Sequence, residues 1–367
     1  MNVVPWLLRI PGLRRYGNQI VHSRRQIERL REKISGLRTR LSDQRADFAV
    51  RTRGHKSRQP APDVLRHVLS ARHRALQANR DSREAAVRRE EHFAARSAEY
   101  AAAIRNPSGA SPLAVKSVVI EGLVWDVPDV ASGGHLANRL INEGWLPFDD
   151  ILATRELAVG VAMLDIGANI GTTSIPRVIL GDFEYVYAAE PDPANYQCLV
   201  HNVAANRLRG FVLPDRIAIG AVDGHATLHR RAGIGTHHLV GAAQAPTDIE
   251  VSCWTLDSWV ARLGVDIHAL TFIKVDTQGW ESQVLRGASS LLAQPHIAWQ
   301  LEFSPRLLMR AGSSAAELIA QLEERFTHFI DLAGRTTPRS KPLSHMRDAL
   351  AYVDRFTNIL VYSARRQ

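Results

Sequence analysis

The chain has 367 residues, of which 45% are hydrophobic and 23% are charged, a globular composition that excludes wholesale disorder. Two cysteines cannot form a disulfide framework, and no Cys/His cluster indicates a structural zinc site. The net charge of +9 is concentrated in residues 1–107, which hold 24 Lys and Arg against 10 Asp and Glu. Because neither a run of about 18 apolar residues nor a signal-peptide pattern occurs, we expect a cytoplasmic protein without a transmembrane segment.

Residues 1–107 are predicted to form a basic, α-helical coiled-coil region. Apolar residues repeat every seven positions at Ile20, Ile27, Ile34, Leu41 and Phe48. This spacing aligns them along one seam that a partner helix must cover. Residues 51–62 predict a hinge, and a second helix follows from residue 63 to about residue 105. An Asn-Pro-Ser-Gly segment then indicates a domain boundary near residue 107. The two helices could fold back on each other as a hairpin or dimerise, and the sequence does not choose between these. We expect a homo-oligomer, or a partner helix bound through residues 20–48.

Residues 108–367 alternate strand-like apolar runs with helical patterns. The runs are Val161–Ile166, Tyr185–Ala189, Arg216–Ile219, Thr271–Val275, Ile297–Leu301 and Asn358–Tyr362. Apolar residues at helical spacing predict helices over 196–203 and 315–322, the second preceded by the capping-box pattern Ser314-x-x-Glu317. This alternation predicts an α/β fold with a largely parallel sheet covered on both faces. In such sheets the ligand lies beyond the carboxyl ends of the strands.

Two motifs follow the first two predicted strands. In Asp165-Ile166-Gly167-Ala168-Asn169-Ile170-Gly171, the glycines allow a sharp turn and close approach to a ligand. Asn169 replaces the second glycine of a dinucleotide fingerprint, and the Asp165 carboxylate suits a ligand with an ammonium group better than a pyrophosphate. Glu190-Pro191-Asp192 ends the second strand with an acidic residue that can accept both ribose hydroxyls of an adenosine. The alternative role, a charge at a helix N-terminus, fits Asp192 better than Glu190.

A third motif, FIKVDTQGWE at 272–281, delivers Lys274, Asp276, Gln278 and Glu281 to one rim. The other matching segments are LDIGANIG at 164–171, AEPDP at 189–193, the helix with Asn202 and Asn206, WTLDSW at 254–259 and Leu301-Glu302. On these motifs the chain resembles the FkbM-type S-adenosylmethionine-dependent methyltransferases over residues 160–305. The resemblance implies a methyltransferase domain at residues 108–367 with a Rossmann-like, seven-stranded, mostly parallel sheet flanked by helices.

The resemblance also implies the cofactor, S-adenosylmethionine, and roles for individual residues. The methionine end of the cofactor would be lined by Asp165, Gly167, Ala168, Asn169 and Gly171. Glu190 would bind the ribose, and the adenine would be flanked by Asp192, Ala218 and Ile219. Asp276 and Glu281 would face the methyl group and the acceptor. Trp280 stands where many members carry a smaller residue, so we expect a different pocket edge here.

An acceptor hydroxyl needs a base, because an alcohol is a weak acid at pH 7. The candidates are Asp276, Glu281 and His237 with its neighbour His238, a pair that could equally be an exposed loop pair. Asp276 could instead hold a divalent metal together with Glu281 or Glu302. The sequence does not establish a metal, and we assign no metal ligands.

We therefore predict an O-methyltransferase that acts on a hydroxyl of a sugar, a glycan or another polyhydroxylated metabolite. An RNA methyltransferase that grips nucleic acid with residues 1–107 is the first alternative. Against it, this region lacks interleaved aromatic residues, and the rim motif differs from the N/D-P-P-Y type of base N-methylation, so we do not expect a nucleic-acid partner. A non-catalytic coiled-coil interaction protein is the second alternative.

Overall fold

The computed structural model describes residues 115–128, 130–230, 237–240, 248–333, 339–350 and 352–363. They all lie in one unit of the chain, Pro60–Gln367. The predicted coiled coil, the predicted second helix and the predicted boundary near residue 107 lie outside the described residues.

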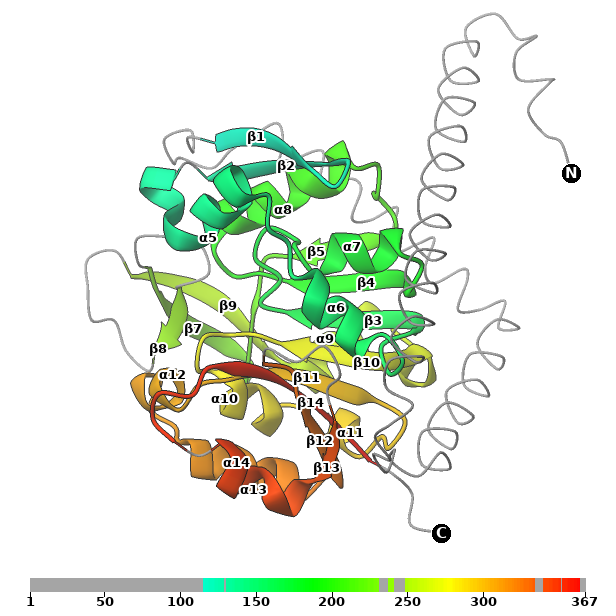
Figure 1. Cartoon of the computed structure of the whole chain (residues 1–367), viewed down its shortest axis with the longest axis vertical. Helices are drawn as coiled ribbons and strands as arrows, with labels where there is room; N and C mark the ends of the chain where they lie inside the picture. The colour runs from blue at the N-terminus through cyan, green and yellow to red at the C-terminus, as the bar shows by residue number, and fades with distance from the viewer. Residues whose placement is uncertain are drawn as a thin grey trace, which may run out of the picture. The chain divides into compact units, whose positions relative to one another are not determined.

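An eight-stranded sheet forms the centre of the fold, in the order β13-β12-β14-β11-β10-β3-β4-β5 (Figure 1). Its strands are β3 (Gly160–Ile166), β4 (Phe183–Ala189), β5 (Val212–Asp215), β10 (Leu270–Val275), β11 (Ala298–Phe303), β12 (His328–Asp331), β13 (Ser340–Pro342) and β14 (Thr357–Tyr362). The strands from β5 to β11 pair in parallel, whereas β14, β12 and β13 pair antiparallel. The expected mostly parallel sheet is therefore confirmed. It has one strand more than the expected seven, because β13 adds to its edge.

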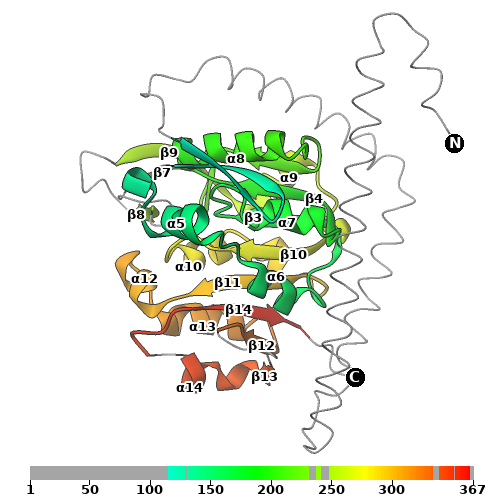
Figure 2. The same ribbon diagram turned by 45° about the horizontal axis from the view of Figure 1, so that its top comes forward.

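Helices cover both faces of this sheet (Figures 1 and 2). One face packs against α9 (Leu256–Leu263), α10 (Glu281–Arg286), α11 (Ser289–Leu292), α12 (Pro305–Arg310), α13 (Ala315–Glu323) and α14 (Met346–Leu350). The other packs against α5 (Val130–Glu143), α7 (Ser174–Ile179) and α8 (Pro193–Ala205). Strands enclosed on both faces carry apolar side chains at nearly every position. All six residues of β10 are buried, and Lys274 is the one charged side chain among them.

A smaller four-stranded sheet lies outside the central one, in the order β6-β9-β7-β8. Its strands are β6 (Ala218–Gly220), β7 (Gly224–His229), β8 (His238–Val240) and β9 (Ile249–Thr255). The predicted run 216–219 is a strand, β6, but it pairs in parallel with β9 rather than with the central sheet. Apolar content alone does not specify which strand a segment pairs with.

A hairpin, β1 (Val115–Ile120) and β2 (Leu123–Pro128), precedes α5 and α6 (Phe148–Thr154). Trp125 and Val127 of β2 are fully buried and join the apolar cluster that contains α8. Within the described residues, no helix combines the length and the apolar character that crossing a membrane requires.

Candidate functional site

The loop after β3 requires glycine at two positions. Gly167 and Gly171 have φ values of 76° and 95°. A Cβ atom at Gly167 would lie 1.9 Å from the backbone oxygen of Asp276, and one at Gly171 would lie 2.8 Å from Leu199 Cδ1. This loop, residues 167–171, therefore packs at Gly167 against the chain that follows β10 and at Gly171 against α8. We call it the glycine loop.

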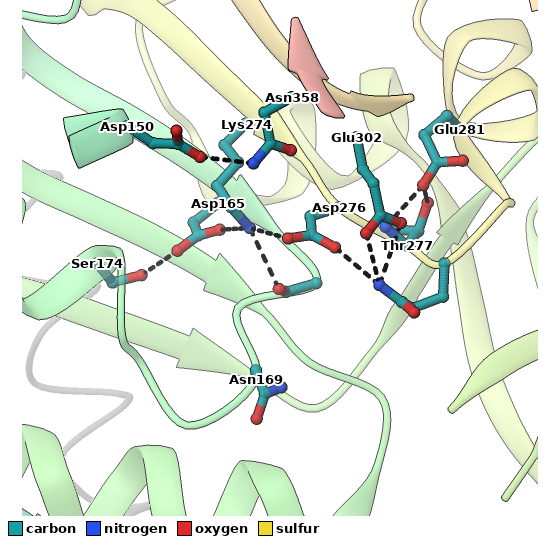
Figure 3. Close-up of polar contacts among 12 residues, drawn as sticks. Asp150, Asp165, Asn169, Ser174, Lys274, Asp276, Thr277, Glu281, Glu302 and Asn358 are labelled. Carbon is teal, nitrogen blue, oxygen red and sulfur yellow. Dashed lines mark hydrogen bonds and ion pairs between the residues drawn. The ribbon is translucent and has the colours of Figure 1, made fainter. Parts of the chain in front are cut away.

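Asp165, the last polar residue of β3, is fully buried and already has partners (Figure 3). Ser174 Oγ donates to its Oδ2 at 2.5 Å, and Lys274 Nζ donates to its Oδ1 at 3.2 Å. Lys274 also lies 3.4 Å from Asp276 Oδ2. Burial would lower the pKa of Lys274, but the two carboxylates outweigh burial and raise the pKa above its ordinary value. Lys274 is therefore a buried cation that joins two strand ends.

Glu190 follows β4 and faces the glycine loop. Its Oε2 accepts from the backbone N–H of Asn169 at 2.8 Å, and its Oε1 accepts from the N–H of Asp192 at 3.0 Å. Burial, and then the charge of Asp192, raise the pKa of Glu190 to about 7. A carboxylate offers about four acceptor sites, so this one retains capacity for ligand hydroxyls.

Asp192 is the N-cap of α8. Its Oδ1 accepts from the N–H groups of Ala194 and Asn195, at 2.9 and 3.0 Å, and its Oδ2 accepts from Arg230 Nε at 2.8 Å. The capping role that the sequence favoured for Asp192 over Glu190 is thus realised. Ala218 and Ile219 are buried on β6, with exposed fractions of 2% and 1%.

Asp276 follows β10 directly and lies at the carboxyl edge of the sheet. Its side chain is 32% exposed, and its backbone N–H donates to Ile166 O at 3.0 Å. Gln278 Nε2 bridges two carboxylates, donating to Asp276 Oδ1 at 3.2 Å and to Glu302 Oε1 at 2.9 Å. Burial, and then the charges of Asp276 and Glu281, raise the pKa of Glu302 well above its ordinary value. Figure 3 shows this chain of contacts running from Asp165 to Glu302.

Glu281 is buried behind the loop that follows β10 and accepts hydrogen bonds from it. It is 1% exposed, and its Oε1 accepts from the N–H and the hydroxyl of Thr277, at 2.8 and 2.9 Å, and from the N–H of Gly279 at 3.3 Å. Burial raises its pKa to about 7. The structure therefore does not bring Glu281 to the accessible rim beside Asp276.

His237 lies at the other end of the site, next to β8. Its Nε2 is 3.8 Å from Asp192 Oδ2, and its side chain is 12% exposed. Burial lowers the pKa of His237. His238 is buried on β8, with its ring centroid 5.0 Å from that of His229. Neither imidazole matches the exposed loop pair considered as the alternative.

Asp150 and Asn358 are part of this edge and were not predicted from the sequence. Asn358 Nδ2 donates to Asp150 Oδ2 at 2.6 Å, beside Lys274 (Figure 3). Asp150 belongs to α6, and Asn358 lies at the start of β14. A strand that runs antiparallel begins where its parallel neighbours end, so a polar residue at the start of the last apolar run is the signal that could have identified Asn358.

The described side chains form no group of three or more His, Cys, Asp or Glu arranged to hold a metal ion. Gln278, an amide, occupies the space between Asp276 and Glu302 that a shared cation would need.

Comparison with known protein families finds a match within the described part of the chain. Residues 165–327 match the family model described as the methyltransferase FkbM domain. This match confirms the resemblance drawn from the motifs, together with the methyltransferase class and the cofactor S-adenosylmethionine that the resemblance implied. No curated protein matches the chain in sequence.

Solved structures show more distant likeness. The methyltransferase FkbM of Methylobacillus flagellatus KT is 18% identical with a TM-score of 0.36, and the match covers 56% of this chain and 44% of that chain. TYW2 of P. horikoshii, in complex with MeSAdo, is 13% identical with a TM-score of 0.35, over 69% of this chain and 73% of that one. The m1A22 tRNA methyltransferase TrmK of B. subtilis is 10% identical with a TM-score of 0.33, over 60% and 67%.

Proposed function

We propose that residues 108–367 form an O-methyltransferase domain that transfers the methyl group of S-adenosylmethionine to a hydroxyl of a sugar, a glycan or another polyhydroxylated metabolite. One observation carries the proposal: two strand ends that bear acidic residues, those of β4 and β10, contact the same glycine loop. Glu190 accepts from the Asn169 N–H at 2.8 Å, and the backbone of Asp276 packs against Gly167. The acceptor class rests on the FkbM resemblance.

The residues around the glycine loop fit S-adenosylmethionine. Among the described side chains, Asn169 and Asn195 each have a buried Oδ1 with no hydrogen-bond partner, on either side of Glu190 in the sequence. Buried polar atoms in proteins are normally satisfied, so acceptors of this kind suit a ligand that brings donors. The ribose diol and the ammonium group of the cofactor are such donors. In our proposal Glu190 holds the ribose, and Asn169 lies at the methionine end.

The resemblance placed Asp165 at the methionine end of the cofactor, and we propose a structural role for it instead. Ser174 and Lys274 each donate to one of its oxygens, and its side chain is fully buried, with an exposed fraction of 0%. We assign it the task of fixing Lys274, which in turn holds Asp276.

S-adenosylmethionine, when bound, supplies a methyl group activated by a positively charged sulfur. The protein must then position the acceptor oxygen and take its proton. Of Asp276, Glu281 and His237, Asp276 has the most exposed side chain and lies at the carboxyl edge. We therefore propose Asp276 as the base. Lys274 contacts one oxygen of the Asp276 carboxylate and Gln278 donates to the other. These contacts fix the orientation of the carboxylate relative to the acceptor hydroxyl.

Formation of S-adenosylhomocysteine in the presence of sugars, oligosaccharides and polyols tests the proposal. We expect turnover with a hydroxylated acceptor, and a loss of about 10²-fold or more in kcat for Asp276→Asn. The Kd for S-adenosylhomocysteine should stay within about threefold, because Asp276 is not assigned to the cofactor. Asp257→Asn is the matched control, since Asp257 bonds to Ser289 and Ser290 away from the glycine loop. Methylation of RNA bases without any hydroxyl acceptor would contradict the proposal.

A further inference from the structure

Helix α8 holds the hairpin β1–β2 through two asparagines. Asn206 Oδ1 accepts from the N–H of Val124 at 2.9 Å, and its Nδ2 donates to Val124 O at 2.7 Å. Asn202 makes the same pair of bonds with the backbone of Asp126. The Oδ1 of Asn202 accepts from the Asp126 N–H at 2.6 Å, and the Nδ2 of Asn202 donates to the Asp126 carbonyl at 3.2 Å. Each side-chain amide thus pairs with β2 as a neighbouring strand would.

The spacing of the two contacts follows from the geometry of the elements. Four residues of α-helix rise about 6 Å, and two residues of strand span about 6.6 Å. Residues i and i+4 share a face of a helix, while residues i and i+2 present their peptide groups to the same edge of a strand. Asn202 and Asn206 therefore match Asp126 and Val124 in register.

The two asparagines differ in one respect. The Nδ2 of Asn202 also donates to the backbone oxygen of Ile170, in the glycine loop, at 2.9 Å. The Nδ2 of Asn206 instead donates to Asn202 O, within its own helix, at 2.9 Å. Asn202 and Ile170 are both fully buried. Both N–H groups of Asn202 are therefore used, one on the hairpin and one on the loop.

This second contact fixes the glycine loop at the residue next to the one that Glu190 binds. The N–H of Asn169 is bound by Glu190, and the carbonyl of the following residue, Ile170, is bound by Asn202. Ala168 and Ile170 also share an apolar cluster with Trp125 of the hairpin. The loop therefore lies between a strand-end carboxylate and an amide that is itself fixed by the hairpin.

We propose that Asn202 is a positioning residue for the cofactor: it ties the hairpin to the glycine loop and thereby sets the affinity for S-adenosylmethionine. This inference rests on the proposed function, because it assumes that the glycine loop receives the cofactor. Asn206 holds the same hairpin without touching the loop, and it is the matched control.

The test compares Asn202→Ala with Asn206→Ala in the full chain. Calorimetry should show S-adenosylhomocysteine binding about tenfold weaker to Asn202→Ala than to the wild type, and within about threefold of the wild type for Asn206→Ala. Thermal unfolding of each variant measures how far loss of the hairpin contact lowers stability. Asn202→Asp is the second variant, because it keeps an oxygen that accepts from the Asp126 N–H while it loses the N–H groups that donate to the carbonyls of Asp126 and Ile170.

Amide hydrogen exchange in the ligand-free protein separates this inference from the proposed function. Exchange at residues 167–171 should be faster in Asn202→Ala and Asn202→Asp and unchanged in Asn206→Ala. If the wild type binds the ligand and both asparagine substitutions weaken binding equally, the inference is wrong and the proposed function stands. If the folded wild type does not bind the ligand, the proposed function fails. Unchanged loop exchange in the Asn202 variants would overturn the inference whether or not the ligand binds.

Discussion

Lys274 is the cation on which the polar core of the site depends. It is buried, it ion-pairs with Asp165 at 3.2 Å and with Asp276 at 3.4 Å, and it lies on the central strand of the site. Removing Lys274 alone leaves the fully buried charge of Asp165 uncompensated, whereas removing both leaves only the charge of Asp276, whose side chain is 32% exposed.

Lys274→Met should therefore lower the free energy of unfolding by about 3–5 kcal/mol. The double variant Lys274→Met/Asp165→Asn should recover part of this loss, since an asparagine keeps an acceptor for Ser174 without the charge. Urea denaturation of the two variants measures both values. A double variant less stable than the single one would contradict this account of the pair.

Glu281→Gln should stabilise the protein at alkaline pH. The pKa of Glu281 is about 7 in the folded chain, above its ordinary value of 4.5, because of burial. Its contribution to stability is therefore greatest below pH 4.5 and is lost as the pH rises towards 7. A neutral glutamine, which can still accept from Thr277, should raise the free energy of unfolding by about 1–2 kcal/mol at pH 8 and by little at pH 5. Denaturation at the two pH values measures the difference.

The same variant distinguishes a supporting Glu281 from a catalytic one. Because the carboxyl is enclosed behind the loop, we expect Glu281→Gln to retain methyl transfer. Loss of kcat comparable to that of Asp276→Asn would show that Glu281 handles the proton instead.

At the scale of single residues, the sequence could identify those that follow strands but not their partners. The motif places Lys274 and Asp276 at the end of the same apolar run, and the structure shows Lys274 in ion pairs with Asp165 and Asp276. That pairing engages Asp165 within the protein, which the motif could not reveal. Asp150 lies more than a hundred residues before Lys274 and reaches the site only because α6 packs there.

Elements with a strong local signal were predictable, and those defined by pairing were not. The run 161–166 became β3, and the capping pattern before residue 315 became the start of α13, where Ser314 Oγ accepts from the Glu317 N–H at 3.1 Å. The hairpin β1–β2 and three strands of the small sheet, β7, β8 and β9, escaped prediction. Their half-buried strands carry mixed polarity, and they are held by contacts with distant residues.

Ser314→Ala should therefore cost the protein about 1 kcal/mol in free energy of unfolding, the usual value of an N-cap side chain. Ser314→Thr retains a hydroxyl and should cost less. Methyl transfer should be unaffected in both, because α13 packs on the sheet away from the glycine loop. Equal stability of the alanine and threonine variants would contradict the capping role.

At the scale of the whole molecule, the basic region 1–107, its heptads and the cytoplasmic location stay predictions. The apolar seam predicted for residues 20–48 would require a partner, and a second copy of the chain is the simplest one. Light scattering of the full chain at micromolar concentration should report a dimer or a larger oligomer. A monodisperse monomer would contradict self-association and leave, as the partner, the second predicted helix of this chain or a helix from another protein.

The central claim, that the glycine loop and Glu190 form a site for S-adenosylmethionine, is tested most directly by calorimetric titration of S-adenosylhomocysteine. The titration uses the full-length wild type, Glu190→Ala and the control Asp257→Asn. We predict binding to the wild type and to the control, and binding at least about tenfold weaker to Glu190→Ala. Absence of binding to the folded wild type, or equal affinity of Glu190→Ala, would contradict the claim.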